Sequence, residues 1–151
     1  MQGLLGPDGV VTGVLGGGRG PSDRVRYVPW GEERLPGADP DAPWPGRLPS
    51  PSPATVPADP VAAEVLDASA APVGVSGRHR LTGRPAAVSV AGGPARPVLA
   101  WAGPWAVEEG WWERGGVRRR ARLQVLLDGV EQTALLLVRE GRAWAVEGVY
   151  D

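Results

Sequence analysis

The 151-residue sequence contains no cysteine, no lysine and no phenylalanine. Without cysteine the chain has no disulfide framework, no thiolate nucleophile and no cysteine-ligated metal site. No stretch approaches the roughly 20 consecutive apolar residues that a membrane-spanning helix needs, so we expect a cytoplasmic protein without a membrane partner. Because phenylalanine is absent, the seven tryptophans must supply much of the aromatic area of any core.

What the chain has in abundance is glycine and proline. The 23 glycines and 17 prolines exceed a quarter of the residues, a level that disfavours helix and favours extended or irregular segments. The net charge is −1, so the protein as a whole lacks the basic field that drives nonspecific attraction to nucleic acid. Any basic surface must therefore come from a local cluster of arginines.

Residues 1–60 are interrupted by glycine and proline too often for regular structure, and we expect a semi-rigid linker or spacer there. Two tryptophans in this segment, Trp30 and Trp44, need an apolar surface to cover them, either on the chain's own domain or on a partner. The sequence leaves these two alternatives open.

Residues 61–151 change to short apolar runs separated by turns, which is typical of a small antiparallel β-meander or barrel-like domain. The stretches "AEVLDA" and "PVGV" predict a first hairpin, and "PAAVSVAGG" and "RPVLAWAG" predict two further strands. The stretches "VRRRARLQVLL", "VEQTALLLVRE" and "RAWAVEGVYD" are joined by short connections of the hairpin kind. The fold class is therefore mostly β, with a largely irregular N-terminal segment before the β-domain.

Period-two alternation divides the arginine run of residues 118–122 between two faces. Arg118, Arg120 and Arg122 fall on the face opposite the apolar residues, and we expect them to form a solvent-exposed ladder. In the last strand Glu147 points away from Trp144, so that it could lie across from one of these arginines. Trp101 and Trp144 both belong to apolar alternations, and we expect both in the core.

The residues do not indicate catalysis. His79 is the sole histidine and lies in a basic, glycine-flanked turn, where we expect it to be exposed and without a carboxylate partner. The carboxylates Glu108, Glu109 and Glu113 could in principle hold a divalent cation, but we expect them to lie in a solvated loop. We therefore expect no catalytic residue, no cofactor and no metal, and the protein is not expected to be an enzyme.

A cluster of tryptophans, glutamates and arginines is the candidate partner-binding surface, because tryptophan and arginine are enriched at interface hot spots. Adjacent side chains of an extended strand point to opposite sides, so one tryptophan of the pair 111–112 should be available to a partner. Two alternatives remain open: that these tryptophans are wholly core, and that the arginine ladder binds single-stranded nucleic acid directly. The candidate residues are Trp105, Trp111, Trp112, Glu108, Glu109, Arg118, Arg120 and Arg122.

The blocks "QGLLGPDGVVTGVLGGGRGPSDRVRYVPWGEE", "DAPWPGRLPSPSPATV", "WAGPWAVEEGWW", "RRRARLQVLLDG" and "WAVEGVYD" cover nearly the whole chain in order. In this order they resemble the C-terminal region of actinobacterial ImuB, a Y-family DNA polymerase-like family. The resemblance implies that a polymerase-like region precedes these blocks in the family. Met1 stands where the family tends to have valine, so we expect either an alternative start within a longer gene or a fragment.

ImuB-like proteins are understood as catalytically inactive adaptors in damage-induced translesion DNA synthesis. The resemblance therefore implies a protein-interaction module whose partners are a RecA-like accessory protein and an error-prone C-family DNA polymerase, located at the nucleoid in the cytoplasm. The sliding clamp is expected to bind only parts of the family that this chain lacks, since the "QLxLW" pattern is absent. A linker of residues 1–60 would tether the module and raise the local concentration of its partners.

Overall fold

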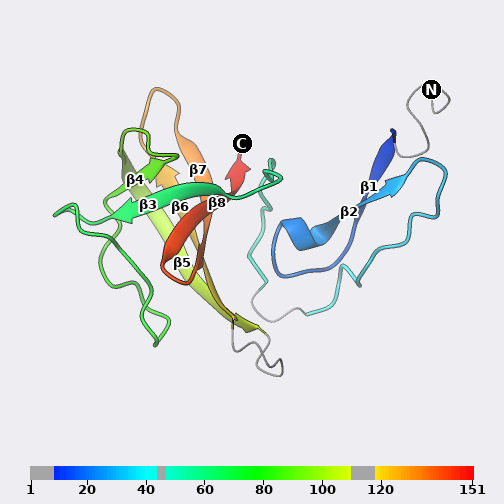
Figure 1. Ribbon diagram of the computed structural model, residues 1–151, viewed down its shortest axis with the longest axis horizontal. Coiled ribbons are helices and arrows are strands. Elements are labelled where there is room, and N and C mark those ends of the chain that lie inside the picture. The colour runs from blue at the N-terminus through cyan, green and yellow to red at the C-terminus, as the bar shows by residue number, and fades with distance from the viewer. Residues whose placement is uncertain (1–8, 44–46, 110–117) are drawn as a thin grey trace. The chain divides into compact units, whose positions relative to one another are not determined.

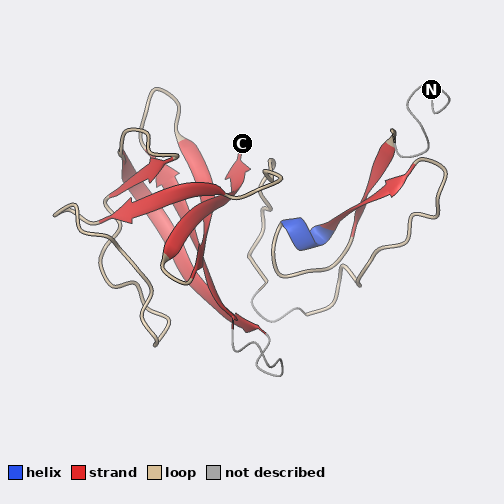
Figure 2. Ribbon diagram, in the orientation of Figure 1, coloured by secondary structure: helices blue, strands red, loops and turns tan. Residues whose placement is uncertain are grey.

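A computed structural model of the protein describes residues 9–43, 47–109 and 118–151. The chain divides into two compact units, Met1–Pro49 and Ser50–Asp151. Both units are built from β-strands, and the structure is mostly β as predicted (Figure 2). In the part of the chain that is described, no helix is long and apolar enough to cross a membrane.

The first unit contains one antiparallel pair, β1 (Val11–Leu15) and β2 (Val25–Pro29), separated by a single 3-10 turn at Ser22–Arg24. The rest of its described residues are irregular, as the glycine and proline content predicted. The hairpin itself was not predicted. It forms because the two valine-containing runs pair in register, with Val14 and Val28 buried.

The second unit is a closed antiparallel barrel of six strands in the order β3-β4-β5-β6-β7-β8, with β8 pairing back onto β3 (Figure 1). Closure leaves no open edge, which removes the usual hazard of edge-to-edge pairing. The strands are β3 (Val61–Leu66), β4 (Ala87–Val90), β5 (Arg96–Glu109), β6 (Arg118–Leu127), β7 (Thr133–Glu140) and β8 (Ala143–Tyr150).

Alternate residues of the strands point inward and fill the barrel with valine, leucine and one tryptophan. Trp144 is 5% exposed and its indole Nε1 donates a 2.7 Å hydrogen bond to the Val73 carbonyl, so its prediction as a core residue is confirmed. This bond ties the long β3–β4 connection to the core. The core comprises Ala63, Val65, Val73, Val88, Leu123, Val125, Leu127, Leu135, Leu137, Trp144 and Val146.

Residues 50–60, which the sequence places in the linker, belong to the compact barrel unit. Thr55 forms a bridge with Val149 of β8, and their backbone groups exchange hydrogen bonds of 3.1 and 2.8 Å. Pro53 packs so closely on Gly148 that a β-carbon there would lie 2.7 Å from the proline ring. We call residues 50–60 the strap. The unit boundary thus falls at Ser50, earlier than the expected boundary at residue 61.

Two local predictions differ from the structure. The stretch "PVGV" is not a strand but part of the β3–β4 connection, held by the isolated bridges Leu66–Pro72 and Val75–Leu81. Strand β5 does not end at Gly103 but continues through Pro104 to Glu109. It continues because a register shift between Ala102 and Trp105 absorbs the irregularity and lets pairing with β6 resume.

Candidate functional site

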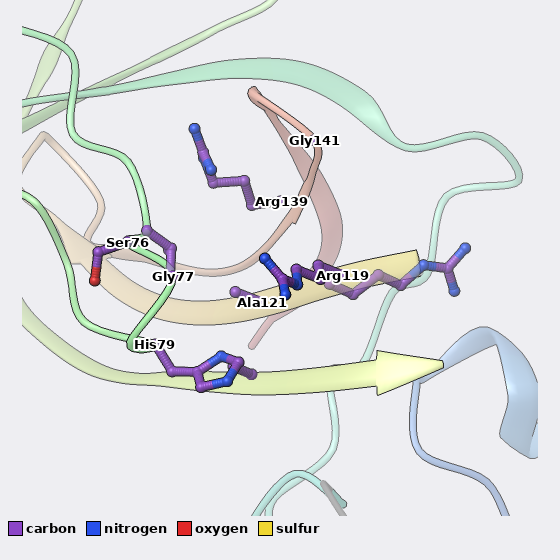
Figure 3. A pocket seen from close by; sticks show the side chains of 10 residues that line it. Ser76, Gly77, His79, Arg119, Ala121, Arg139 and Gly141 are labelled. Carbon is purple, nitrogen blue, oxygen red and sulfur yellow. The ribbon is translucent and has the colours of Figure 1, made fainter. Parts of the chain in front are cut away.

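A cavity of about 230 Å³ opens at one end of the barrel (Figure 3). The β3–β4 connection lines one side of the cavity, and the ends of β5, β6 and β7 line the other. Four of its lining residues are Arg119, Arg120, Arg139 and His79, so the cavity is basic although the protein carries a net charge of −1. We call this region the basic end.

Two glutamates at the basic end form ion pairs. Glu108 of β5 lies 3.1 Å from Nε of Arg119 and 3.8 Å from Nε2 of His79. Glu140 of β7 pairs with Arg120 of β6. His79 is exposed as predicted, but the prediction that it lacks a carboxylate partner is wrong, because pairing of β5 with β6 carries Glu108 to the histidine loop.

Arg139 of β7 is a partly buried cation of the cavity. Its Nε is buried and has no hydrogen-bond partner, and its Nη2 donates only a long 3.4 Å bond to the Arg142 carbonyl. The guanidinium lies 5.8 Å from the centre of the Trp144 ring. Burial lowers the pKa of Arg139, and the charge of Arg142 lowers it further. Among the described residues, no carboxylate forms an ion pair with this arginine.

The predicted arginine ladder does not exist as a solvent-exposed row, because Arg122 is only 2% exposed. Its Nε and Nη2 donate hydrogen bonds of 2.6 and 2.9 Å to the two carboxylate oxygens of Glu147. The prediction that Glu147 meets one of the arginines is confirmed. The period-two pattern placed Arg122 on the correct face, but there Arg122 lies between Trp105 of β5 and Val138 of β7 and is buried.

Trp101 is 36% exposed, so the prediction that it belongs to the core is wrong. Register shifts on both sides of it, between Val98 and Ala100 and between Ala102 and Trp105, break the alternation from which its burial was inferred. Leu99, 48% exposed, lies two residues before it. The guanidinium of Arg84 lies 5.1 Å from the centre of the Trp101 ring. We call Leu99, Trp101 and Arg84 the Trp101 patch.

The other candidate residues are distributed along the β5–β6 hairpin. Trp105 is partly buried on β5 opposite Arg122, and Glu108 lies on the same strand rather than in a loop. The backbones of Glu109 and Arg118 pair with each other. The side chains of these two residues, together with Trp111, Trp112 and Glu113, lie outside the described part of the structure. The described residues include no group of three His, Asp or Glu side chains that could hold a metal ion.

The opposite end of the barrel is apolar. A cavity of about 410 Å³ is lined there by residues of the strap, the starts of β3 and β7 and the β4–β5 turn. Its walls include Val61, Val90 and Val149, and Arg96 is held at its rim by bonds to the Asp128 and Glu131 carbonyls. The two ends of the barrel therefore differ in chemical character.

The structure also shows two functional candidates that the sequence did not reveal: Arg139 at the basic end and the pair Leu99–Trp101 on β5. Arg139 is separated by 60 residues from His79, so only the folded barrel brings them to one cavity. A weak signal was present for Leu99, because "VLAWAG" places apolar residues at successive positions rather than at alternate ones.

The described fold is a small closed six-stranded antiparallel barrel with one basic and one apolar end. Comparison of the chain with protein-family models, with curated proteins and with solved structures finds no match.

Proposed function

We propose that this chain is a non-catalytic protein-interaction module of an ImuB-like Y-family polymerase homologue, which tethers partners during damage-induced translesion DNA synthesis. Its partners are a RecA-like accessory protein and an error-prone C-family DNA polymerase, and it acts at the nucleoid in the cytoplasm. The resemblance of the sequence blocks to the ImuB C-terminal region supports the identity of these partners.

The observation that carries the docking proposal is the exposure of Leu99 and Trp101 on barrel strand β5. An exposed tryptophan offers a large contact area at a low cost in conformational entropy, and an arginine above its ring is a common companion at interface hot spots. Arg84 occupies this position. We therefore propose the Trp101 patch as the docking surface in place of the residues first predicted. Trp105 lies further along the same strand.

The predicted arginine ladder does not support docking or nucleic-acid binding, because its arginines do not form an exposed row. Arg122 is committed to the buried pair with Glu147, and Arg120 pairs with Glu140. A single-strand-binding ladder would need these side chains in a row facing solvent. The three arginines therefore do not form the continuous binding row that the alternative requires.

The test is capture of each purified partner by the immobilised full chain, measured separately for the RecA-like protein and the polymerase. Trp101→Ala should weaken capture of the true partner by about 2 kcal/mol or more, as hot-spot tryptophans do. Because Trp101 lies outside the core, the same variant should change the free energy of unfolding by only about 1 kcal/mol.

Val130→Ser provides the matched control, because Val130 is fully exposed in the β6–β7 connection and far along the chain from the patch. It should bind like the parent. Trp111→Ala and Trp112→Ala test the earlier prediction that one of this pair contacts the partner. Capture of neither protein by the parent, or equal capture by the parent, the Trp101 variant and the Trp111 and Trp112 variants, would show that the docking proposal is wrong.

A further inference from the structure

Positive charge is concentrated at the basic end. Arg78 and Arg80 flank His79 in the β3–β4 connection, and Arg142 follows Gly141 in the turn between β7 and β8. With Arg119, Arg120 and Arg139, three separate segments of the chain bring arginines to this end. Among the described residues of this end, Glu108 and Glu140 are the carboxylates that pair with cations, so the described arginines outnumber these carboxylates.

The buried Nε of Arg139 has no hydrogen-bond acceptor among the described residues of this end. Removing a cation from water costs free energy unless an anion or hydrogen-bond acceptors replace the water. Among the described residues the buried Nε of Arg139 has no such acceptor, and the charge that acts on this group is that of another arginine, Arg142. An anion in the cavity would supply the missing acceptor and relieve the repulsion between the two arginines.

The cavity beside Arg139 is suited to an anion with several oxygen atoms. Ser76 contributes a hydroxyl, and Gly77 lets the backbone of the loop approach the cavity without a side chain. Arg139 also lines a second, wider hollow of about 720 Å³ beside β3, together with Arg142. In Figure 3, Ser76 and His79 lie on one side of the cavity, and Arg119 reaches along β6 away from Arg139.

We propose that the basic end of the barrel binds single-stranded nucleic acid, with one backbone phosphate in the cavity at Arg139 and neighbouring phosphates at the surrounding arginines. This activity goes beyond the docking function and does not depend on it, because it uses neither Leu99 nor Trp101. No bond is made or broken, and the barrel acts only as a binding surface.

Two observations favour a nucleic acid over an acidic peptide. Arginines from β6 and β7 and the histidine of the β3–β4 connection line one small cavity, which matches a ligand that carries one phosphate at every nucleotide. His79 presents an exposed imidazole at the same cavity, and histidine is one of the side chains on which unpaired bases stack. An acidic peptide offers carboxylates but no planar bases.

The experiment measures fluorescence anisotropy of a labelled oligothymidylate of about 12 nucleotides, titrated with the full chain between about 50 and 200 mM salt. The parent should bind, and affinity should fall as salt rises. Arg139→Gln should weaken binding by about tenfold, the usual effect of losing one charge-assisted hydrogen bond to phosphate. Arg142→Gln should reduce the slope of log affinity against log salt by about 0.7.

Arg26→Gln is the matched control, because Arg26 is an exposed arginine of β2 in the first compact unit. It removes the same charge and should bind like the parent. Circular dichroism of each variant reports whether the barrel is folded. If Arg139→Gln unfolds, the Arg142→Gln slope alone decides the proposal, since Arg142 is an exposed turn residue.

Competition distinguishes the ligand classes. Inorganic pyrophosphate should compete only weakly, because it can occupy the cavity but not the surrounding arginines. Equal competition by polyglutamate and unlabelled oligothymidylate would overturn the proposal in favour of an acidic peptide. Absence of binding at about 50 mM salt, or equal weakening by the Arg26 and Arg139 variants, would overturn it as well. None of these results depends on partner capture, so the docking proposal is tested separately.

Discussion

The buried pair of Arg122 and Glu147 permits a quantitative prediction. Arg122 is 2% exposed and the Glu147 side chain is 10% exposed, and two hydrogen bonds join the guanidinium to both carboxylate oxygens. Removing one partner of a buried pair leaves an uncompensated charge, which costs about 3–5 kcal/mol. We therefore expect Glu147→Gln to reduce the free energy of unfolding by about 3 kcal/mol, because glutamine retains one acceptor oxygen but no charge.

Glu140→Gln is the matched control for this experiment. It makes the same chemical change in the pair with Arg120, whose members are 30% and 56% exposed. An exposed pair contributes about 1 kcal/mol or less. For a small domain each kcal/mol shifts Tm by about 4–8 °C, so thermal and urea unfolding of the two variants should separate them clearly.

The double variant Arg122→Met with Glu147→Leu tests the explanation itself. Replacing both charges with apolar groups of similar volume removes the desolvation penalty together with the attraction. The double variant should therefore be more stable than Glu147→Gln alone. If Glu147→Gln is no more destabilising than Glu140→Gln, the pair is hydrated and the reasoning is refuted.

Tyrosine titration gives an independent measure of the same carboxylate. Burial raises the pKa of Tyr150, and the negative charge of Glu147 raises it further. In a Tyr27→Phe background, which leaves Tyr150 as the single tyrosine, Glu147→Gln should lower the pKa seen in tyrosinate absorbance while burial keeps it above 10. An unchanged pKa would mean that the carboxylate does not act on Tyr150.

Three further variants test the strap, the core and a loop. Trp144→Phe removes the donor to the Val73 carbonyl and should cost about 1–3 kcal/mol in urea unfolding. Gly148→Ala places a β-carbon 2.7 Å from Pro53 and should speed amide exchange in the strap while the other strands stay protected; uniform exchange would contradict this. A hydrogen bond from the Ser69 hydroxyl, together with bonds from the Ala71 and Ser69 amides, lowers the pKa of Asp67. The stabilisation is therefore present above the unfolded pKa of about 3.9 and is lost as pH falls through the folded value, so Asp67→Asn should reduce the loss of stability at acid pH.

Much of the barrel could be predicted because its strands carry their own signals. The stretches of the last three strands are rich in apolar residues and are joined by short turns, and the structure places β6, β7 and β8 at these stretches. The N-terminal hairpin was missed because glycine and proline around Val11–Leu15 and Val25–Pro29 outweighed two short valine runs. Propensity is a weak guide where pairing between distant segments decides the structure.

Burial of individual side chains was harder to predict, and for identifiable reasons. Alternation assigns residues to two faces of a strand but does not show whether the second face is covered. Arg122 was therefore placed on the correct face and yet is buried, because the outer face there is covered. The prediction that Trp101 is buried was wrong for a different reason. Each register shift in β5 changes the face to which the following residues belong, so the alternation could not be extended to Trp101.

The basic end could not be recognised from the sequence because its charge belongs to no single segment. The arginine run at 118–122 is conspicuous in the chain, yet Arg122 is buried in a pair with Glu147 and Arg120 is paired with Glu140. Arg139, whose buried Nε has no described hydrogen-bond partner, is the single arginine of a mainly apolar strand and is followed by Glu140. Barrel closure brings the β7–β8 turn beside the histidine loop and so gathers charges from separate segments at one cavity. For a protein with a net charge of −1, the anion binding that we propose depends on this local arrangement and not on the sum of its charges.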